Sequence, residues 1–262
     1  MSAYTETDLV TTIGQLAGAD LSDLTQAQLD GIDQFHGGGA EAVDRLIPSL
    51  DLSAGMTLLD VGSGLGGPAR QIARTTGCDV LGVDLTEAYV EAATALTSVA
   101  RLGARVQFLH SDIARLQRSG FDAALSMHVQ MNVDDKSAFF GEIAKRLRRG
   151  ACLAVFEVCR ASEDALPLPL PWSIDGTDSF LAAPSDLLGV IEDSGFTALE
   201  WVDETPWVLQ WFDDLGSRLA AAETEASLPA LLADGPTRMI NFAVALADGT
   251  FTVHRGAFRL AD

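Results

Sequence analysis

Apolar positions over residues 57–126 fall into short runs that alternate with longer segments of mixed polarity. The apolar runs predict strands at 57–62, 79–84, 105–109 and 121–126, and the segments between the first three predict helices at 67–76 and 87–101. Such alternation is typical of a parallel sheet whose helices cross over its faces in the right-handed sense. The pattern therefore predicts a doubly wound, Rossmann-like α/β fold.

The pattern continues beyond residue 126. A helix is expected over 135–148, because acidic residues at its start and basic residues at its end complement the helix dipole, with Gly150 as its C-cap. Residues 151–158 are apolar enough for a strand that is buried on both faces. The proline-rich residues 161–182 predict a long loop or flap. The later elements are expected to be a helix at 185–194, a strand at 197–203, an acidic helical stretch at 206–231, a helix at 236–246 and a last strand at 251–260.

The first 50 residues predict a helical cap. Val43, Leu46, Ile47 and Leu50 recur at helical spacing, and Pro48 is expected to kink or end this helix near its last turn. We therefore divide the chain into a helical cap at 1–50, a cofactor-binding core at 51–160 and a C-terminal part at 161–262. That last part is expected to supply the flap, further helices and the final strands of the same sheet.

A glycine-rich turn joins the first predicted strand to the helix after it. A strand, a glycine turn and a helix start place backbone N–H groups and the positive end of a helix beside a bound ligand. Gly62, Gly64 and Gly67 fit the G-x-G-x-x-G pattern of dinucleotide sites, so a nicotinamide cofactor is one candidate. Asp60 favours a different ligand, since an acid at this position faces a cation well and repels a pyrophosphate.

Two more acids follow the next two strands. Asp84 ends the second strand, where a carboxylate can accept both hydroxyls of a ribose. Asp112 follows the third strand and could accept the amino group of adenine, or it could cap the turn at 113–117. Leu85 could pack on the adenine or belong to the core. Three acids after three successive strands suit adenosine joined to a cationic amino acid, which describes S-adenosylmethionine.

The segment from Leu58 to Gly67 resembles motif I of the class I S-adenosylmethionine-dependent methyltransferases. Three later segments resemble the ribose-binding strand end, the adenine-binding turn and the fourth motif of the same family: Gly82–Thr86, Ser111–Ile113 and Phe121–His128. The resemblance covers about residues 50–160 in the family's order. It implies a seven-stranded sheet whose last strand is antiparallel and lies between the fifth and the sixth. It also implies S-adenosylmethionine as the cofactor, held by Asp60, Gly62, Gly64, Gly66, Asp84, Leu85, Asp112, Ile113 and Met127.

Two further segments look like the small-molecule branch of that family, which includes sarcosine/dimethylglycine and quinone-biosynthesis type enzymes. They are Asp33–Gly38 and His128–Asn132. In the resembling enzymes the first segment folds over the cofactor, so Gln34 and His36 are candidates for the methionine end or the substrate. His128, just past the fourth strand, is the predicted base or substrate-orienting residue, with a histidine satisfied within its loop as the alternative. Trp172 in the flap could wall the acceptor pocket or pack as part of an exposed linker.

Methyl transfer is an in-line displacement at a sulfonium, so an enzyme mainly has to position the nucleophile and exclude water. A base such as His128 or His36 is needed only when the nucleophile carries a proton. The predicted function is therefore methyl transfer from S-adenosylmethionine to an N, O or C atom of a small molecule. Two alternatives stay open: an S-adenosylmethionine-binding protein without methyl transfer, and an NAD(P)-dependent oxidoreductase.

Composition and net charge limit the kinds of molecule that the protein is expected to bind and the compartment in which it is expected to work. A formal net charge of −20 disfavours nucleic-acid backbones and anionic membranes. No run approaches the ~20 apolar residues of a membrane span, and the acidic residues 1–8 lack the basic region of a secretory signal. Cys78, Cys152 and Cys159 show no metal-ligand spacing, so no metal site is expected. These features predict a cytoplasmic protein with reduced thiols.

Overall fold

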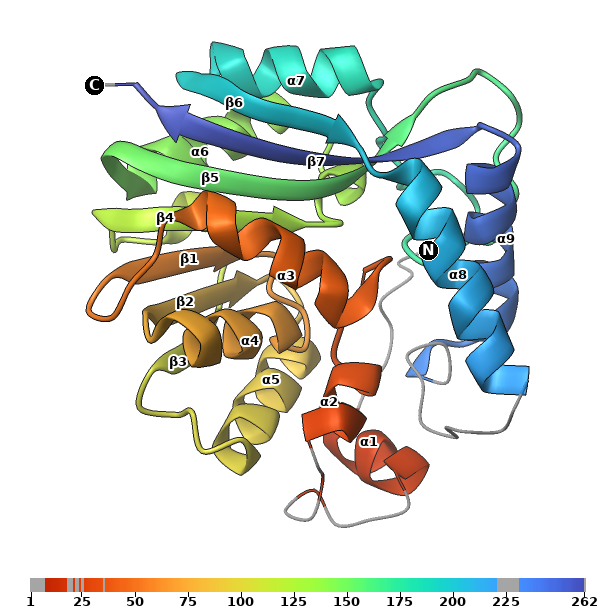
Figure 1. Cartoon of the computed structure of the whole chain (residues 1–262), viewed down its shortest axis with the longest axis horizontal. Helices are drawn as coiled ribbons and strands as arrows, with labels where there is room; N and C mark the ends of the chain where they lie inside the picture. The colour runs from red at the N-terminus through yellow and green to blue at the C-terminus, as the bar shows by residue number, and fades with distance from the viewer. Residues whose placement is uncertain are drawn as a thin grey trace.

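The computed structural model describes residues 8–17, 21, 24, 26–34, 36–220 and 231–261. Within them, seven strands form one sheet in the order β3-β2-β1-β4-β5-β7-β6 (Figure 1). The strands are β1 (Thr57–Val61), β2 (Asp79–Asp84), β3 (Val106–His110), β4 (Phe121–Met127), β5 (Leu147–Arg160), β6 (Phe196–Asp203) and β7 (Phe251–Leu260). Strands β1 to β5 pair in parallel, and β7 lies antiparallel between β5 and β6. The predicted seven-stranded α/β fold is confirmed.

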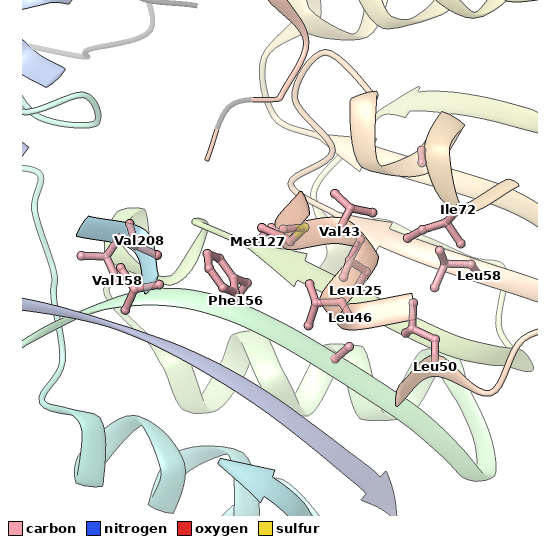
Figure 2. Close-up of a cluster of buried hydrophobic side chains, with 14 of the residues drawn as sticks. Val43, Leu46, Leu50, Leu58, Ile72, Leu125, Met127, Phe156, Val158 and Val208 are labelled. Carbon is pink, nitrogen blue, oxygen red and sulfur yellow. The ribbon is translucent and has the colours of Figure 1, made fainter. Parts of the chain in front are cut away.

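Helices cover both faces of the sheet because its strands bury side chains on both. Leu58, Leu125 and Phe156 lie in one core cluster (Figure 2). Leu59 and Leu153 lie in the other. The first cluster includes residues of α3 (Gly39–Leu50), α4 (Gly67–Thr76), α8 (Thr205–Ala220) and α9 (Gly235–Ala247). The second includes residues of α6 (Lys136–Arg146) and α7 (Pro184–Asp193). A third cluster joins α5 (Glu87–Val99) to α1 (Leu9–Ala17) and α2 (Gln26–Ile32) (Figure 1).

The predicted end of one helix is overridden by strand pairing. The helix expected over 135–148 ends at Arg146, because Leu147 already pairs with Phe121 as the first residue of β5. Gly150 therefore lies inside a strand, with φ +69°, and the prediction that it caps the helix was wrong. Pro48 lies in the last turn of α3, which ends at Leu50, in agreement with the prediction that the helix ends near this proline.

The N-terminal and C-terminal parts add detail to the predicted organisation. Helix α3 packs directly on the sheet through Val43 and Leu46, so of the three described N-terminal helices only α1 and α2 form a cluster apart from it.

The stretch predicted at 206–231 is helical as α8, and its residues 221–230 lie outside the described residues. Residues 161–182 form neither helix nor strand, as predicted. Trp172 in that segment is 2% exposed and contacts Phe242 and Phe251, so the exposed-linker alternative was wrong. The division of the chain at residues 50 and 160 stays a prediction.

Candidate active site

The carboxyl ends of four parallel strands meet at one edge of the sheet and carry the predicted site. Register pairs Val61 with Val83 and with Ser126, and Asp84 with His110. The polar and glycine-rich segments that follow these strands therefore start side by side, as expected for ligand sites in parallel sheets. They are the glycine turn after β1, Asp84 at the end of β2, Asp112 after β3 and His128 after β4.

The glycine turn is held by β2 and by neighbouring side chains. The N–H groups of Gly62 and Ser63 donate to the Val83 carbonyl oxygen at 2.8 and 3.1 Å. A Cβ on Gly62 would lie 2.4 Å from Cγ2 of Val129. A Cβ on Gly66 would lie 2.3 Å from Cζ of Phe108, which packs against the turn from β3. Both positions also have positive φ, a conformation that glycine adopts readily. Backbone conformation and packing within the protein therefore both require glycine at these two positions.

Asp84 organises the backbone at the end of β2. Its Oδ2 accepts the N–H of Gly64 and its Oδ1 accepts the N–H of Thr86, both at 2.8 Å. Burial raises the pKa of this carboxyl, while these two hydrogen bonds oppose the rise. A carboxylate has further acceptor positions on each oxygen, so Asp84 can still accept hydroxyl donors. Leu85 beside it is 70% exposed, which excludes the core role.

Asp60 is the least satisfied acid of the site. It is 3% exposed, and its Oδ2 has no hydrogen-bond partner among the described residues. Burial, and then the charge of Asp84, raise the pKa of Asp60 to about 7, although Arg70 acts in the opposite direction. The hydroxyl of Ser63 is also buried without a partner in the described part of the chain. Unpaired buried oxygens are costly, so a cationic or donating ligand here would stabilise the protein.

Asp112 and Ile113 lie at the end of β3. Oδ1 of Asp112 accepts the N–H of Ala114 at 2.9 Å, at the start of the 3₁₀ helix η2 (Ile113–Arg115). The capping alternative is therefore present in the structure. Asp112 is exposed and Ile113 is buried, which leaves the carboxylate free to meet a ligand while the isoleucine packs beneath it.

An ion pair that was missed in the sequence ties the N-terminal segment to the glycine turn. Nη2 of Arg70, on α4, lies 2.7 Å from Oδ2 of Asp33 and 2.7 Å from the Leu65 carbonyl oxygen. Both charged side chains are about 1% exposed, and burial outweighs Arg70 so that the pKa of Asp33 rises to about 6. Gly67 allows this approach, since a Cβ there would lie 2.5 Å from the Asp33 carbonyl oxygen.

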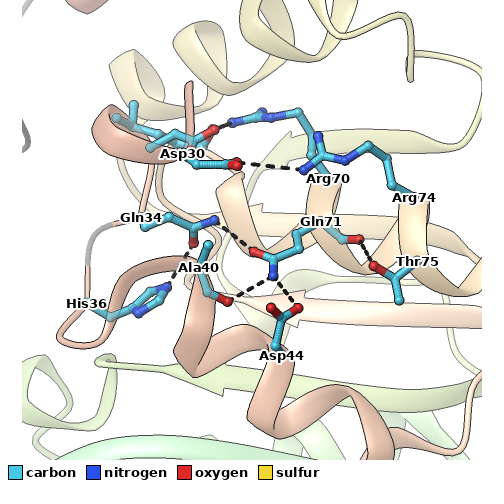
Figure 3. A network of polar contacts seen from close by, with 11 residues as sticks. Asp30, Gln34, His36, Ala40, Asp44, Arg70, Gln71, Arg74 and Thr75 are labelled. Atoms are coloured by element: carbon cyan, nitrogen blue, oxygen red, sulfur yellow. Dashed lines mark hydrogen bonds and ion pairs between the residues drawn. The ribbon is translucent and has the colours of Figure 1, made fainter. Parts of the chain in front are cut away.

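A chain of amides orients His36 (Figure 3). Nε2 of Gln71 donates to Asp44 at 2.7 Å, and this fixes the Gln71 Oε1 to accept from Nε2 of Gln34 at 3.2 Å. Oε1 of Gln34 then lies 3.0 Å from Nε2 of His36, and the Gly37 carbonyl oxygen lies 3.2 Å from its Nδ1. Burial lowers the pKa of His36 to about 4, so the ring is neutral at pH 7 and can donate its one N–H to either of these acceptors. Both ends of the Gln34 amide thus have partners within the protein.

His128 lies next to His36 on the aromatic side of the site. The two ring centroids are 6.1 Å apart, and the His128 ring stacks on Phe156 at 5.8 Å. Phe242 meets the His128 ring edge-on at 6.0 Å. Burial, and then His36, hold the pKa of His128 well below its ordinary value. Its Nε2 has no partner within the described residues, so this neutral imidazole can hydrogen-bond a ligand.

Glu157 is a buried acid of β5 that the sequence interpretation overlooked. It is 0% exposed; its Oε1 accepts the Ser126 hydroxyl at 2.7 Å, and its Oε2 accepts the N–H of Val129 at 2.9 Å. Burial raises the pKa of this carboxyl to about 7. A signal was available, because Glu157 is the single charged residue in the apolar run 151–159. The predicted cofactor residue Met127 is buried at the end of β4 and belongs to the first core cluster.

These contacts join two chemical environments at one edge of the sheet. The glycine turn offers N–H groups and carboxyls, whereas His128 and the neighbouring His36 offer neutral imidazoles among aromatic rings. The two meet where Val129 packs over Gly62. Among the described residues, no group of three or more His, Cys, Asp or Glu side chains is arranged to hold a metal ion. None of the described helices has both the length and the apolar character needed to cross a membrane.

Residues 59–155, which include the glycine turn, the three acids and His128, match the family described as "Methyltransferase domain". The chain contains a methyltransferase domain. Over 189 residues the chain is 27% identical to sterol 24-C-methyltransferase ERG6A of Gibberella zeae, an alignment covering 68% of this chain and 50% of that protein. The match thus spans about half the length of that relative.

Two solved structures share the fold of this methyltransferase domain and its flanking helices. A putative sarcosine dimethylglycine methyltransferase from Galdieria sulphuraria has a TM-score of 0.67 and 16% identity, with 85% of each chain covered. The [4+2]-cyclase SpnF has a TM-score of 0.68 and 23% identity, with 97% of this chain and 94% of that chain covered. The likeness extends over almost the whole chain, including the parts outside residues 59–155.

Proposed function

We propose that the protein is an S-adenosylmethionine-dependent methyltransferase that acts on a small molecule. The observation that carries the proposal is the pair of carboxyls, buried Asp60 and half-buried Asp84, at the glycine turn of a methyltransferase domain. A nicotinamide dinucleotide would bring a pyrophosphate to this turn, where both acids would repel it. A ligand with a sulfonium and an ammonium group would instead relieve the unpaired oxygen of Asp60.

The residues of the cofactor site divide by the part of the cofactor that each would hold. The turn with Gly62 and Gly64, together with Asp60, would bind the methionine end. Asp84 would accept the ribose hydroxyls while keeping its bonds to the backbone. At the adenine, Asp112 would accept the amino group, with Leu85 and Ile113 packing on the ring. Gln34 would not contact the cofactor but would orient His36. Met127 would support the site by packing in the core beneath it.

The acceptor is proposed to lie against His128 and His36. When bound, S-adenosylmethionine supplies a methyl group on a positively charged sulfur. The neutral His128 Nε2 orients the acceptor and takes its proton if the attacking atom carries one. The contacts of His36 with Gln34 and Gly37 hold its ring in place beside His128. The surrounding Phe156 and Phe242 exclude water from the reacting atoms, which favours an acceptor with an apolar body.

The size of the acceptor, the cellular compartment and the partners can also be proposed. The curated relative is described as a sterol methyltransferase, which supports an acceptor of small-molecule size. The net charge of −20 supports a protein that works in the cytoplasm without nucleic-acid or membrane partners.

The test starts with calorimetric titration of S-adenosylmethionine, S-adenosylhomocysteine and NADH. Binding of the first two and not of NADH is expected. Mass spectrometry of incubations with candidate amines, phenols and isoprenoid alcohols should then show S-adenosylhomocysteine and an acceptor that is 14 mass units heavier, the mass of one methylene. A rearranged acceptor of unchanged mass would instead favour an activity such as the one in the name of the cyclase SpnF. Tight NADH binding alone would refute the proposal.

A further inference from the structure

Glu157 lies beneath the turn that carries His128, on the opposite side of the sheet from the histidine rings. Phe156, which stacks on His128, belongs to the first core cluster, and its neighbours Val155 and Cys159 belong to the second. Side chains alternate along a strand, so Glu157 points to the same side as Val155. A residue in this place does not reach the His128 ring, so Glu157 has no direct part in the proposed methyl transfer.

The contacts of Glu157 converge on the turn after β4. Its Oε2 accepts two successive backbone N–H groups, from Val129 at 2.9 Å and from Gln130 at 3.2 Å. These N–H groups open the 3₁₀ helix η3 (Gln130–Asn132), and successive N–H groups of this kind form a site for a carboxylate. The Gln130 side chain also donates to the Val158 carbonyl oxygen, so β5 holds this turn at two points.

The turn needs such support because its backbone is strained. His128 has φ +52°, a left-handed conformation that a non-glycine residue keeps only when its surroundings impose it. The next residue, Val129, packs so closely over Gly62 that a Cβ on that glycine would lie 2.4 Å away. At its far end the turn is fixed by Lys136, whose Nζ donates to the Val133 carbonyl oxygen at 2.8 Å. One turn therefore sets both the His128 ring and the contact with the glycine turn.

We propose that Glu157 is a positioning residue of the methyl-transfer site, which holds the His128 turn in register with the cofactor-binding glycine turn through its hydrogen bonds. The inference rests on the proposed function for its catalytic consequence. It assigns Glu157 no contact with cofactor or acceptor and no transfer of a proton.

A role through hydrogen bonds can be separated from one through charge. A glutamine at 157 could accept both N–H groups with its amide oxygen and donate its NH₂ to the Ser126 hydroxyl, which can serve as acceptor instead of donor. A leucine of similar size removes every one of these bonds. Ser126→Ala is the matched control, because it removes one bond of Glu157 and leaves the two bonds to the turn intact.

The experiment measures native-state hydrogen exchange at the Val129 and Gln130 amides, calorimetric affinity for S-adenosylhomocysteine, and kcat and KM with any acceptor that supports turnover. Glu157→Leu should speed exchange of both amides at least tenfold, weaken S-adenosylhomocysteine several-fold and lower kcat about tenfold with KM little changed. Glu157→Gln should restore most of each value, and Ser126→Ala should leave both amides protected.

Several outcomes would overturn the inference. Unchanged exchange in Glu157→Leu would show that the bonds do not hold the turn, and equal losses in Glu157→Gln would assign the effect to charge or proton transfer. If Glu157→Leu does not fold, rapid exchange of the Val129 and Gln130 amides in the wild-type protein still contradicts the inference. Failure of the wild-type protein to bind S-adenosylhomocysteine would instead refute the proposed function, and the exchange measurements would still be informative about the turn.

Discussion

The glycine turn and the His128 turn adjoin each other, yet burial shifts the pKa values of their ionisable groups in opposite directions, because one region holds acids and the other holds histidines. At the glycine turn, burial raises the pKa of Asp60 and Asp84, so removing these acids from water favours their uncharged forms. At the His128 turn, burial lowers the pKa of His36 and His128, so these rings are neutral at pH 7. A bound cation would stabilise the ionised carboxyls of the first region, whereas the histidines of the second region are uncharged. A positively charged donor and an uncharged nucleophile are therefore expected on the two sides of one junction.

The largest expected effect comes from the histidine side. His128→Ala should lower turnover about 10²-fold, about 2.7 kcal/mol, because it removes the group that orients the acceptor and takes its proton. Calorimetric affinity for S-adenosylmethionine should not change. The matched control is His254→Ala, another buried histidine, which stacks on Trp201 in the β6–β7 region. Equal turnover in the two variants would assign His128 to packing alone.

The next effect tests the acid side. Asp84→Ala should weaken S-adenosylmethionine binding at least tenfold, about 1.4 kcal/mol, through loss of the ribose contact and of the bond to Gly64. Asp122→Ala is the control, since Asp122 also accepts a backbone N–H, from Thr57 at 2.8 Å, but lies at the amino end of β4. Circular dichroism should show both variants folded. Comparable S-adenosylmethionine affinity in the two would remove Asp84 from the cofactor site.

A smaller effect follows from the pKa of about 7 at Asp60. The carboxyl is mostly ionised at pH 8 and mostly protonated at pH 6, and only the ionised form attracts a cation. Affinity for S-adenosylmethionine should therefore fall several-fold as the pH falls from 8 to 6. Asp60→Asn should bind more weakly at pH 8 and should lose most of this pH dependence in calorimetric titrations. An unaltered slope in Asp60→Asn would exclude Asp60 as its source.

The raised pKa of Asp60 also predicts how the stability of the folded protein depends on pH. An acid whose pKa is higher in the folded than in the unfolded state favours folding less as the pH rises from about 4 to about 7. Without ligand, Asp60→Asn should therefore raise the thermal midpoint at pH 8, and a lowered midpoint there would count against the burial assigned to Asp60.

The smallest effect concerns an apolar contact. Leu85→Ser should weaken S-adenosylmethionine binding about threefold, since only part of one side chain would be covered by the adenine. Leu199→Ser, on β6, is the control because that leucine is also exposed, at 57%. Both variants should keep the wild-type thermal midpoint. A Leu85→Ser protein with unchanged affinity would show that the adenine lies elsewhere.

Much of the fold was predictable from local patterns. The strand at 79–84 and the helix at 67–76 have the predicted bounds, because apolar runs and glycine turns fix those ends locally. The end of α6 could not be predicted from the local sequence, because it is determined by the pairing of Leu147 with Phe121 on a neighbouring strand. The site divides in the same way. The acids after the strands could be named from their positions, whereas the partners of Arg70 and Glu157 depend on contacts between segments far apart in the sequence.

The ion pair between Asp33 and Arg70 constrains how this chain can be recombined with its relatives. A chimaera whose residues 1–38 come from a parent without an acid at position 33 would leave the buried Arg70 guanidinium without its carboxylate, at a cost of about 3–5 kcal/mol. Gly67 adds a second requirement, because any side chain there would collide with the incoming backbone. Productive crossovers in a library would thus carry Asp33, Gly67 and Arg70 from one parent, and the N-terminal segment would be inherited together with the loop that it covers.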